Sequence, residues 1–495
     1  MPKPTQSLAR LGRAFALAVL AAAALPAFAA AHAGFVESEP VPGTELQAGP
    51  GQITLTFTEP LNRGLTEATL VDAQTGERIP AELSFPAERE LRLVPGSRLV
   101  RDPYRVEWRT VSTVDGHALE GSFGFGVGVP AAEAEGSVEQ SPLARGGWVR
   151  IAARLLLYAS LFFFAGGVFA SALLSRRGGP GRWLFPAAVS AHLAPSADSS
   201  DALAERAWQR TLDAGWLAAG AAVGAVAVEA LDAAGGLSVG AMHDFLLTNS
   251  AGLARLGTVL FLLLAAALAA RFRIAASGAL VVAFLTIAVS GHAYSAELRG
   301  PAVLTDWLHL LAGAVWIGGI AQVALAWVPL VSRVDAEGRR AAMRSVLGRF
   351  GRLALPAFLV VAGTGLLNAL IQLGEVPALW ETAYGRVLAA KITLVGLIAI
   401  ASYAHALRLR PRLLADNPPP PERLERRHWR LLGSEPLLAI GVVAAAAALV
   451  AFPLPPRQLG EADESAAADS SPCPVTETRP DELAIADHAG SRIVA

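Results

Sequence analysis

Cysteine and methionine are nearly absent from this chain of 495 residues, which has one cysteine and three methionines. A single cysteine, Cys473, cannot form a disulfide within the chain or build a cysteine-based metal site. The GxxxxGK[ST] phosphate-binding loop is missing too, which excludes an ATP-driven motor of that kind. Only 17% of the residues are charged, 53% are hydrophobic and the formal net charge is −1. The chain is therefore too apolar for a soluble enzyme of this length, and we expect no nucleic-acid partner and no catalytic residues.

The first 31 residues have the composition of a secretory signal peptide. Three basic residues precede an apolar run over residues 14–25, and Ala29 and Ala31 supply the small residues of an A-x-A cleavage site. Cleavage after Ala31 makes His32 the first residue of the mature chain, and cleavage after Ala29 is the alternative. The run could instead be an uncleaved membrane span, although about a dozen apolar residues are few for the ~30 Å of a bilayer core.

Residues 32–128 alternate apolar and polar side chains in short runs, the pattern of half-buried β-strands. The runs, separated by turn signals, are GQITLTFTEPL (51–61), EATLVDA (67–73), ELRLVPG (90–96), YRVEWRTVS (104–112) and GSFGFGVGV (121–129). Several short strands within about a hundred residues predict an all-β Greek-key sandwich of antiparallel strands. An acidic linker over residues 129–147 follows.

Long apolar segments replace the alternating pattern from Trp148 onward. Each segment is long enough, or nearly so, to cross a bilayer as a helix. We therefore predict an all-α polytopic bundle of about eight transmembrane helices over residues 148–455. The segments are 149–174, 212–232, 254–270, 274–291, 303–330, 353–373, 387–407 and 434–452.

Arginines between these segments predict how the chain crosses the membrane. If the sandwich is exported, the inward-facing loops hold 20 arginines, whereas the short outward loops hold Arg299 and Arg386, with Arg255 at an edge. This distribution follows the positive-inside rule and agrees with the signal peptide. An even number of spans then places residues 456–495, an acidic tail that we expect to be disordered, on the outer side. The inward-facing loops are 175–211, 271–273, 331–352 and 408–433.

A free N-terminal histidine would offer a metal two nitrogen atoms, its α-amine and a ring nitrogen. Two further ligands would complete a tetragonal nitrogen and oxygen set, the geometry that suits Cu(II). Asp115 and His117 are two residues apart in TVSTVDGHALEGSFGF, so on extended backbone their side chains leave the same face. The alternative is that Asp-Gly forms an ordinary turn and that His117 is an exposed residue without a function.

The sandwich region resembles the CopC family of copper-resistance proteins. The resemblance is carried by His32, SEPVPG (38–43), TFTE (56–59), YRVEWRTVS (104–112), DGH (115–117) and GSFGF (121–125). It implies that His32, Asp115 and His117 are Cu(II) ligands, with Glu59 as a fourth ligand or a group that orients the others. Some CopC proteins carry a methionine-rich Cu(I) site. This mature chain has only Met242 and Met343, both in the membrane region, so we expect Cu(II) binding alone in the sandwich.

Ionisable residues inside predicted spans are costly and are candidates for function. Asp306 and His309 lie three apart on one helical span, near its outer end, and His292 ends the preceding span at the same face. His243, in the outward loop GAMHDF (240–245), and Glu229, near the outer end of the second span, are weaker candidates for the same copper relay. The alternative is that histidines at span ends simply hydrogen-bond head groups or backbone at the interface.

The membrane region resembles the CopD family of integral membrane copper proteins. The resemblance is carried by SGH (290–292), DWLHLLAGAVWIGG (306–319) and YGRVLAAK (384–391), and it covers residues 148–455. It implies a CopC–CopD fusion in the bacterial inner membrane, with the sandwich and tail in the periplasm. We expect it to capture Cu(II), import copper of unknown oxidation state and contribute to copper resistance. The expected partners are copper, the lipid bilayer and periplasmic copper chaperones.

Two other functions remain open from the sequence. The membrane half could be a haem or copper oxidoreductase that reduces Cu(II), although membrane haem proteins usually pair histidines across the bilayer and here no span carries two. The protein could also be a copper buffer with a membrane anchor, although eight spans with embedded ionisable groups are more than an anchor needs.

Overall fold

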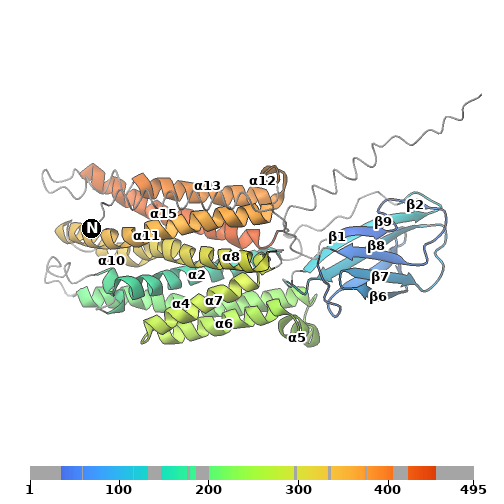
Figure 1. Cartoon of the computed structure of the whole chain (residues 1–495), viewed down its shortest axis with the longest axis horizontal. Helices are drawn as coiled ribbons and strands as arrows, with labels where there is room; N and C mark the ends of the chain where they lie inside the picture. Colours follow the sequence, from blue (N-terminus) through green and yellow to red (C-terminus); the bar gives the residue numbers. More distant parts are fainter. Residues whose placement is uncertain are drawn as a thin grey trace, which may run out of the picture.

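A β-sandwich stands end-on against one end of a long helical bundle in the computed structural model of this chain (Figure 1). The structure describes residues 35–57, 59–114, 116, 118–131, 147–175, 179–185, 200–294, 298–332, 336–373, 376–404 and 422–452. The predicted signal peptide, most of the linker and the acidic tail lie outside these residues. We call the end of the bundle next to the sandwich the sandwich end, and the opposite end the far end.

The sandwich has a four-stranded sheet in the order β1-β3-β7-β6 and a five-stranded sheet in the order β2-β9-β8-β4-β5. The chain passes between the sheets after β1, β2, β3, β5 and β7, as in Greek-key sandwiches. The strands are β1 (Phe35–Glu39), β2 (Glu45–Leu46), β3 (Ile53–Phe57), β4 (Glu67–Asp72), β5 (Arg78–Ile79), β6 (Ala81–Ala87), β7 (Glu90–Pro95), β8 (Pro103–Val111) and β9 (Ala118–Val127).

Period-two alternation builds the core between the two sheets. In β3 the side chains of Ile53, Leu55 and Phe57 are buried while the threonines between them are not. The Phe57 ring packs edge-on against Trp108 of β8, with ring centroids 5.3 Å apart. This arrangement confirms the predicted β-sandwich. One pairing differs from the prediction, because the two-residue strand β2 runs parallel to β9 rather than antiparallel.

The bundle has a helix at the position of each of the eight predicted spans. Its α-helices are α2 (Gly147–Leu174), α4 (Ser200–Ala233), α5 (Val239–Leu247), α6 (Ser250–Ala269), α7 (Arg273–Val289), α8 (Arg299–Gly313), α9 (Gly319–Ala321), α10 (Val328–Val331), α11 (Ala336–Leu373), α12 (Ala378–Glu381), α13 (Ala383–Ala404) and α15 (Glu422–Leu449). Short 3₁₀ turns are η1 (Pro180–Trp183) and η2 (His292–Tyr294), and π-helical segments are η3 (Ala314–Gly318) and η4 (Gln322–Trp327).

Six of the described helices are long and apolar enough to cross a membrane. They are Gly147–Leu174, Asp201–Ala233, Ser250–Ala269, Arg299–Val331, Ser345–Leu373 and Ala383–Ala404. The apolar helices at the other two predicted positions, Arg273–Val289 and Glu435–Leu449, are shorter. The chain is therefore an integral membrane protein with several spans, while the count of eight is not confirmed.

The span from α8 to α10 contains two π-helical segments and approaches α2 at the level of the backbone. A Cβ atom on Gly166 of α2 would lie 2.3 Å from the carbonyl carbon of Gly318, which is far closer than atoms can pack. Small residues that let helices approach this closely are typical of membrane helix interfaces. Nearby, the buried Gln322 amide donates to Phe163 O at 2.8 Å and to Thr211 Oγ1 at 3.0 Å, which links this span to α2 and α4.

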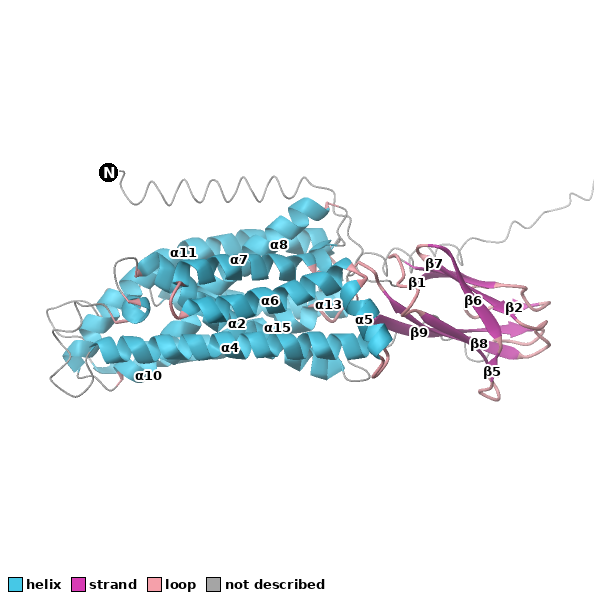
Figure 2. Cartoon of the chain, turned by 90° about the horizontal axis from the view of Figure 1, so that it is seen from below, coloured by secondary structure: helices cyan, strands magenta, loops and turns pink. Residues whose placement is uncertain are grey.

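The segment around GAMHDF, which the sequence suggested was an outward loop, is the helix α5. Ser238 caps its N-terminus by accepting from the backbone N–H of Ala241, a favourable signal for helix initiation. The helix lies across the sandwich end of the bundle, beside the base of the sandwich (Figure 2). It presents Phe245, which is completely buried.

Direct contacts join the sandwich to the bundle. Leu65 and Val111 of the sandwich form one buried apolar cluster with Ala230, Ala233 and Phe245 of α4 and α5; we call these five residues the docking cluster. Beside it, the Arg109 guanidinium of β8 donates to two backbone carbonyl oxygens at the end of α4, those of Asp232 and Ala233. Carbonyl oxygens at a helix C-terminus lack partners within the helix, so a cation is a favourable cap there.

Candidate functional site

The turn between β8 and β9 carries two of the predicted copper ligands. Asp115 and His117 lie outside the described residues, as does His32, but Gly116 between them is described. Its backbone N–H donates to Ser112 O at 3.1 Å and its φ is +72°, a left-handed conformation that favours glycine. The backbone of this turn is therefore fixed by the described residues on either side of the ligand positions.

Glu59 lies at the base of this turn. Its side chain is 4% exposed, and the Ser112 hydroxyl donates to its Oε2 at 2.5 Å. The Ser112 oxygen in turn accepts from the backbone N–H of Val114 at 3.0 Å. A buried carboxylate costs free energy unless hydrogen bonds or a cation compensate. The role that the CopC resemblance implies for Glu59 stays a prediction.

The turn between β8 and β9 contacts the helical bundle at Gly116. A Cβ atom on Gly116 would lie 2.9 Å from Cε2 of Phe245 and 3.0 Å from a guanidinium nitrogen of Arg255. Only a residue without a side chain fits there. Gly116, which stands between the two predicted ligands in the sequence, therefore belongs to the part of the sandwich that touches the bundle.

Below Phe245, three charged side chains form an ion-pair group. Glu229 of α4 accepts from Arg255 Nε at 2.6 Å and from Arg154 Nε at 2.8 Å, so both of its oxygens are engaged. Arg255 also lies over the Phe245 ring, 5.2 Å from its centroid. Two guanidinium groups compensate the charge of Glu229, which favours a structural role at the sandwich end over metal ligation.

Asp306 and His309 of α8 face polar side chains of α11. His309 Nδ1 lies 3.0 Å from Thr364 Oγ1, and the Thr364 hydroxyl donates its proton to Val360 O at 2.6 Å. His309 Nδ1 is therefore the donor in the first bond, which leaves the lone pair on Nε2. A neutral imidazole whose other nitrogen is held in this way is the usual form of a histidine metal ligand.

Asp306 and the neighbouring polar groups continue this contact towards the sandwich end. Asn368 donates to Asp306 Oδ1 at 3.2 Å, and Tyr384 of α13 donates to Gln372 Oε1 at 2.5 Å. Thr364, Asn368 and Gln372 are spaced by four residues, so they share one face of α11. The sequence analysis missed this face, although polar residues repeating every fourth position in an apolar span are a signal that could have revealed it.

The absence of a side chain at Gly365 of α11 makes room for the His309 ring. A Cβ atom on Gly365 of α11 would lie 3.1 Å from His309 Cε1. Asp306 is seven residues into its helix, so at 1.5 Å per residue it lies about 10 Å from the helix start. Both side chains are half-buried.

The other predicted relay residues stand apart from this pair. His243 of α5 is exposed, and its Nδ1 lies 3.2 Å from Asp244 Oδ1. His292 is buried in η2, which packs against α7 and the start of α8. Among the residues that the structure describes, no three His, Cys, Asp or Glu side chains are grouped so that they could hold a metal ion.

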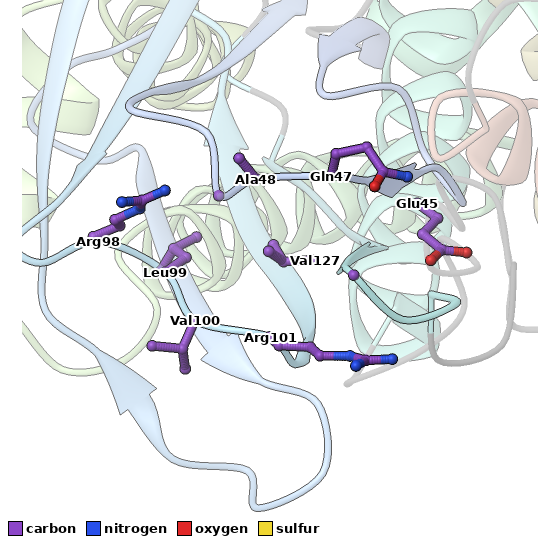
Figure 3. A pocket seen from close by; sticks show the side chains of 10 residues that line it. Glu45, Gln47, Ala48, Arg98, Leu99, Val100, Arg101 and Val127 are labelled. Carbon is purple, nitrogen blue, oxygen red and sulfur yellow. The ribbon is translucent and has the colours of Figure 1, made fainter.

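A hollow of about 690 Å³ opens at the end of the sandwich opposite the turn between β8 and β9 (Figure 3). Arg98, Leu99, Val100 and Arg101 line one wall, and the end of β9 forms part of the opposite side. Strand β9 starts directly after the turn between β8 and β9 and ends at the hollow. Because it runs for ten residues, its two ends are about 30 Å apart. The hollow is therefore remote from the predicted ligands.

These features define a class before any relative is considered: an integral membrane protein whose helical bundle carries a β-sandwich docked beside the turn between β8 and β9. Residues 35–128 match the CopC domain, and residues 344–449 match CopD, "Copper resistance protein D". The chain thus has a CopC domain followed by a CopD domain, the combination of a copper resistance and transport family. The CopD match includes Thr364, Asn368 and Tyr384 but begins after Asp306 and His309.

Parts of the chain are also similar to individual known proteins. The chain is 27% identical over 461 residues to the copper transport protein CutJ of Bacillus subtilis (strain 168), covering 88% of this chain and 77% of that protein. It is 29% identical over 115 residues to protein YobA of Escherichia coli (strain K12), covering 23% of this chain and 92% of YobA. Among solved structures it is similar to PcoC, a methionine-rich copper resistance protein from Escherichia coli, with 27% identity and a TM-score of 0.18. That match covers 20% of this chain and 99% of PcoC.

Proposed function

We propose that this protein captures Cu(II) at the turn of its sandwich and imports copper across the bacterial inner membrane, without catalysing a reaction on it. The observation that carries the proposal is the contact of Gly116 with Phe245 and Arg255. It supports a short route from the capture site to the bundle, because the ligand-bearing turn and the membrane half meet there.

For capture, we assign His32, Asp115 and His117 as Cu(II) ligands, with Glu59 as the buried carboxylate that completes or supports the set. The strand pairing supports this choice. Phe35 pairs with Phe57, two residues before Glu59. His32 is three positions before Phe35 in the sequence, and three residues of extended chain span about 10 Å, a reach that allows a mature N-terminus to approach Glu59.

For passage through the membrane, we assign Asp306 and His309 as the outer copper station, with His292 at its entrance. His309 Nε2 offers the lone pair, and Asp306 offers a carboxylate one helical turn away. His243 and Glu229 receive no ligand role in this proposal, since one is exposed and the other is held by two arginines.

The proposed orientation places the sandwich in the periplasm and the far end in the cytoplasm. Arginine-rich connections between the predicted spans support it, because positive charge is retained on the cytoplasmic side. Copper would then reach the sandwich from the periplasm, either as the free ion or from a copper chaperone. A capture domain on the outer side would supply copper for inward movement, which supports import over export.

Cellular copper content tests the proposal. Cells that express the protein should accumulate more copper than cells without it, and combined His292→Ala and His309→Ala changes should remove the difference. His243→Ala, a histidine substitution on the same side of the bundle, is the matched control and should leave accumulation unchanged. Accumulation that is lower in expressing cells would contradict import. Wild-type accumulation by the double variant at normal expression would contradict the relay.

A further inference from the structure

We propose that Lys391 of α13 is a tethered cation that occupies the neighbourhood of Asp306 and His309 when no metal is bound, and that copper must displace it to enter. The inference rests on the proposed function, since it assigns a regulator to the same outer station. It concerns which cations can pass, and it depends on how α13 packs against α11.

The packing of α13 on α11 brings Lys391 to the level of the station. The two helices follow each other in the chain through the short α12, and Tyr384 OH donates to Gln372 at 2.5 Å. One turn further along α13, Leu388 belongs to the same apolar cluster as Ala369. The two helices run in opposite directions, and Tyr384 is level with Gln372. Lys391, seven residues after Tyr384, is therefore level with Gly365, seven residues before Gln372.

Gly365 is the glycine that contacts the His309 ring. Lys391 is accordingly within electrostatic range of both Asp306 and His309, across the α8–α11 contact. It is half-buried, about 12 Å from the start of a span at 1.5 Å per residue. An ammonium group at this depth is costly unless an opposite charge compensates it.

Asp306 is the compensating charge. Its described hydrogen bond comes from Asn368, a neutral donor, and Lys391 is the described cation whose charge acts on it. Arg154 and Arg255 are held by Glu229 at the sandwich end. Two opposite charges that are partly removed from water attract far more strongly than the same charges in solution.

This arrangement makes the station selective. Lys391 already compensates the negative charge of Asp306. A cation that is attracted only by this charge therefore gains little by replacing the ammonium group, and it is kept out of the station. Copper gains a coordination bond to the lone pair of His309 Nε2, and this bond is stronger than the hydrogen bond that an ammonium group could donate to the same atom. Lys391 therefore raises the copper concentration needed to fill the station and prevents leakage of other ions.

Copper transport by the full-length protein in proteoliposomes tests the inference. Lys391→Met, which keeps the length and removes the charge, should lower the half-saturating copper concentration about tenfold, equivalent to about 1.4 kcal/mol. The maximal rate should not rise. Lys391→Arg, which retains the charge, should keep the wild-type half-saturation. Arg386→Gln is the matched control: Arg386 is on the same helix, exposed and bonded to Trp380 O and Glu381 O.

A lysine that only holds the helices together predicts a different result, namely a lower maximal rate with unchanged half-saturation in Lys391→Met. That result would overturn the role proposed for Lys391 and would leave the proposed copper transport untouched. Loss of transport in Asp306→Asn and His309→Ala is expected independently. If those two variants transport normally, the proposed outer station is wrong and the role of Lys391 in transport is lost with it.

Thermal unfolding provides a measurement that does not depend on transport. Asp306→Asn should destabilise the protein by leaving the ammonium group uncompensated, and adding Lys391→Met should restore part of the lost stability. A double variant as unstable as the single one would overturn the pairing of Lys391 with Asp306.

Discussion

Gly116 links the two halves of the protein at the scale of a single residue. Its φ of +72° is unfavourable for any residue with a Cβ atom, and the space that a Cβ atom would need is taken by Phe245 and Arg255. A left-handed conformation alone costs a non-glycine residue about 1–2 kcal/mol. The same position therefore controls the shape of the turn and its contact with the bundle.

Gly116→Ala should weaken Cu(II) binding by the full-length protein and loosen the contact of the sandwich with α5. Gly76→Ala is a matched control, because Gly76 also has a positive φ, of +73°, but its Cβ atom would meet nothing within 4 Å. Cu(II) titration and hydrogen exchange in α5 measure the two effects. Equal behaviour of both variants would contradict a specific role for the Gly116 contact.

At the scale of one element, the turn between β4 and β5 depends on a carboxylate. Hydrogen bonds from the backbone N–H groups of Thr75 and Gln74 to Asp72 lower the pKa of this exposed group. Because the folded-state pKa is lowered, its contribution to stability is present above the unfolded pKa of about 4 and is lost as the pH falls through the folded value.

Asp72→Asn should therefore reduce the thermal stability of the sandwich at pH 7, and the difference from wild type should be smaller at pH 3 than at pH 7. Asparagine keeps the shape and an acceptor oxygen but not the charge. Unfolding of the sandwich followed by circular dichroism over this pH range measures the effect. A difference of the same size at both pH values would show that the charge is not the cause.

Helix packing gives a second prediction at this scale. Gly166→Ala should disrupt the contact between α2 and the α8–α10 span, at a cost on the order of 2–3 kcal/mol, because the neighbour is backbone that cannot move aside. Gly220→Ala in α4, where a Cβ atom would meet nothing within 4 Å, should be neutral or stabilising. The thermal stability of the two purified variants in detergent makes the comparison, and similar melting temperatures would contradict it.

Much of the fold could be predicted at the scale of elements, because burial on one side produces a regular sequence pattern. Strands β3, β4, β7, β8 and β9 were found by alternation, and each predicted span coincides with a helix. Strand β6 was missed because its sequence, AELSFPA, contains a proline and shifts register against β7. Helix α5 was missed because nine residues are too short to show a span. The predicted number of eight spans is not confirmed, because two of the apolar helices are shorter than a membrane span.

Docking of the sandwich on the bundle belongs to the scale of the whole molecule. The docking cluster and the Arg109 cap hold the turn between β8 and β9, which contains the predicted ligand positions, against the sandwich end. Phe245→Ala removes a fully buried ring from this interface, which typically costs about 3–5 kcal/mol. We expect copper accumulation to fall while Cu(II) binding by the sandwich persists.

Two measurements check this separation: Cu(II) titration of the purified variant and copper accumulation in cells. Phe272→Ala is a control, since Phe272 is an exposed aromatic residue beyond the other end of α6. Loss of Cu(II) binding in Phe245→Ala would show that the capture site itself depends on the bundle. Unchanged accumulation would show that docking is dispensable.

The candidate site was less predictable than the fold because it depends on contacts between distant segments. Asp306 and His309 were found as rare ionisable residues in an apolar span. Their partners Thr364 and Asn368 are neutral, so nothing in the sequence set them apart from ordinary polar residues. Glu229 shows the converse: its sequence position suggested a ligand, but its two arginine partners come from helices far away in the chain.

The Arg109 cap also bears on how sequences of this architecture can diverge. Arg109 bonds backbone carbonyl oxygens of residues 232 and 233, and any amino acid at those positions supplies the same oxygens. Asp232 can therefore change without loss of the cap, although its own pair with Arg150 would be lost. Position 232 can thus change while the cap is kept. The substitutions that would weaken the seat of the sandwich fall on Arg109, on Glu120, which bonds the Arg109 side chain, and on Ala233, which is buried in the docking cluster.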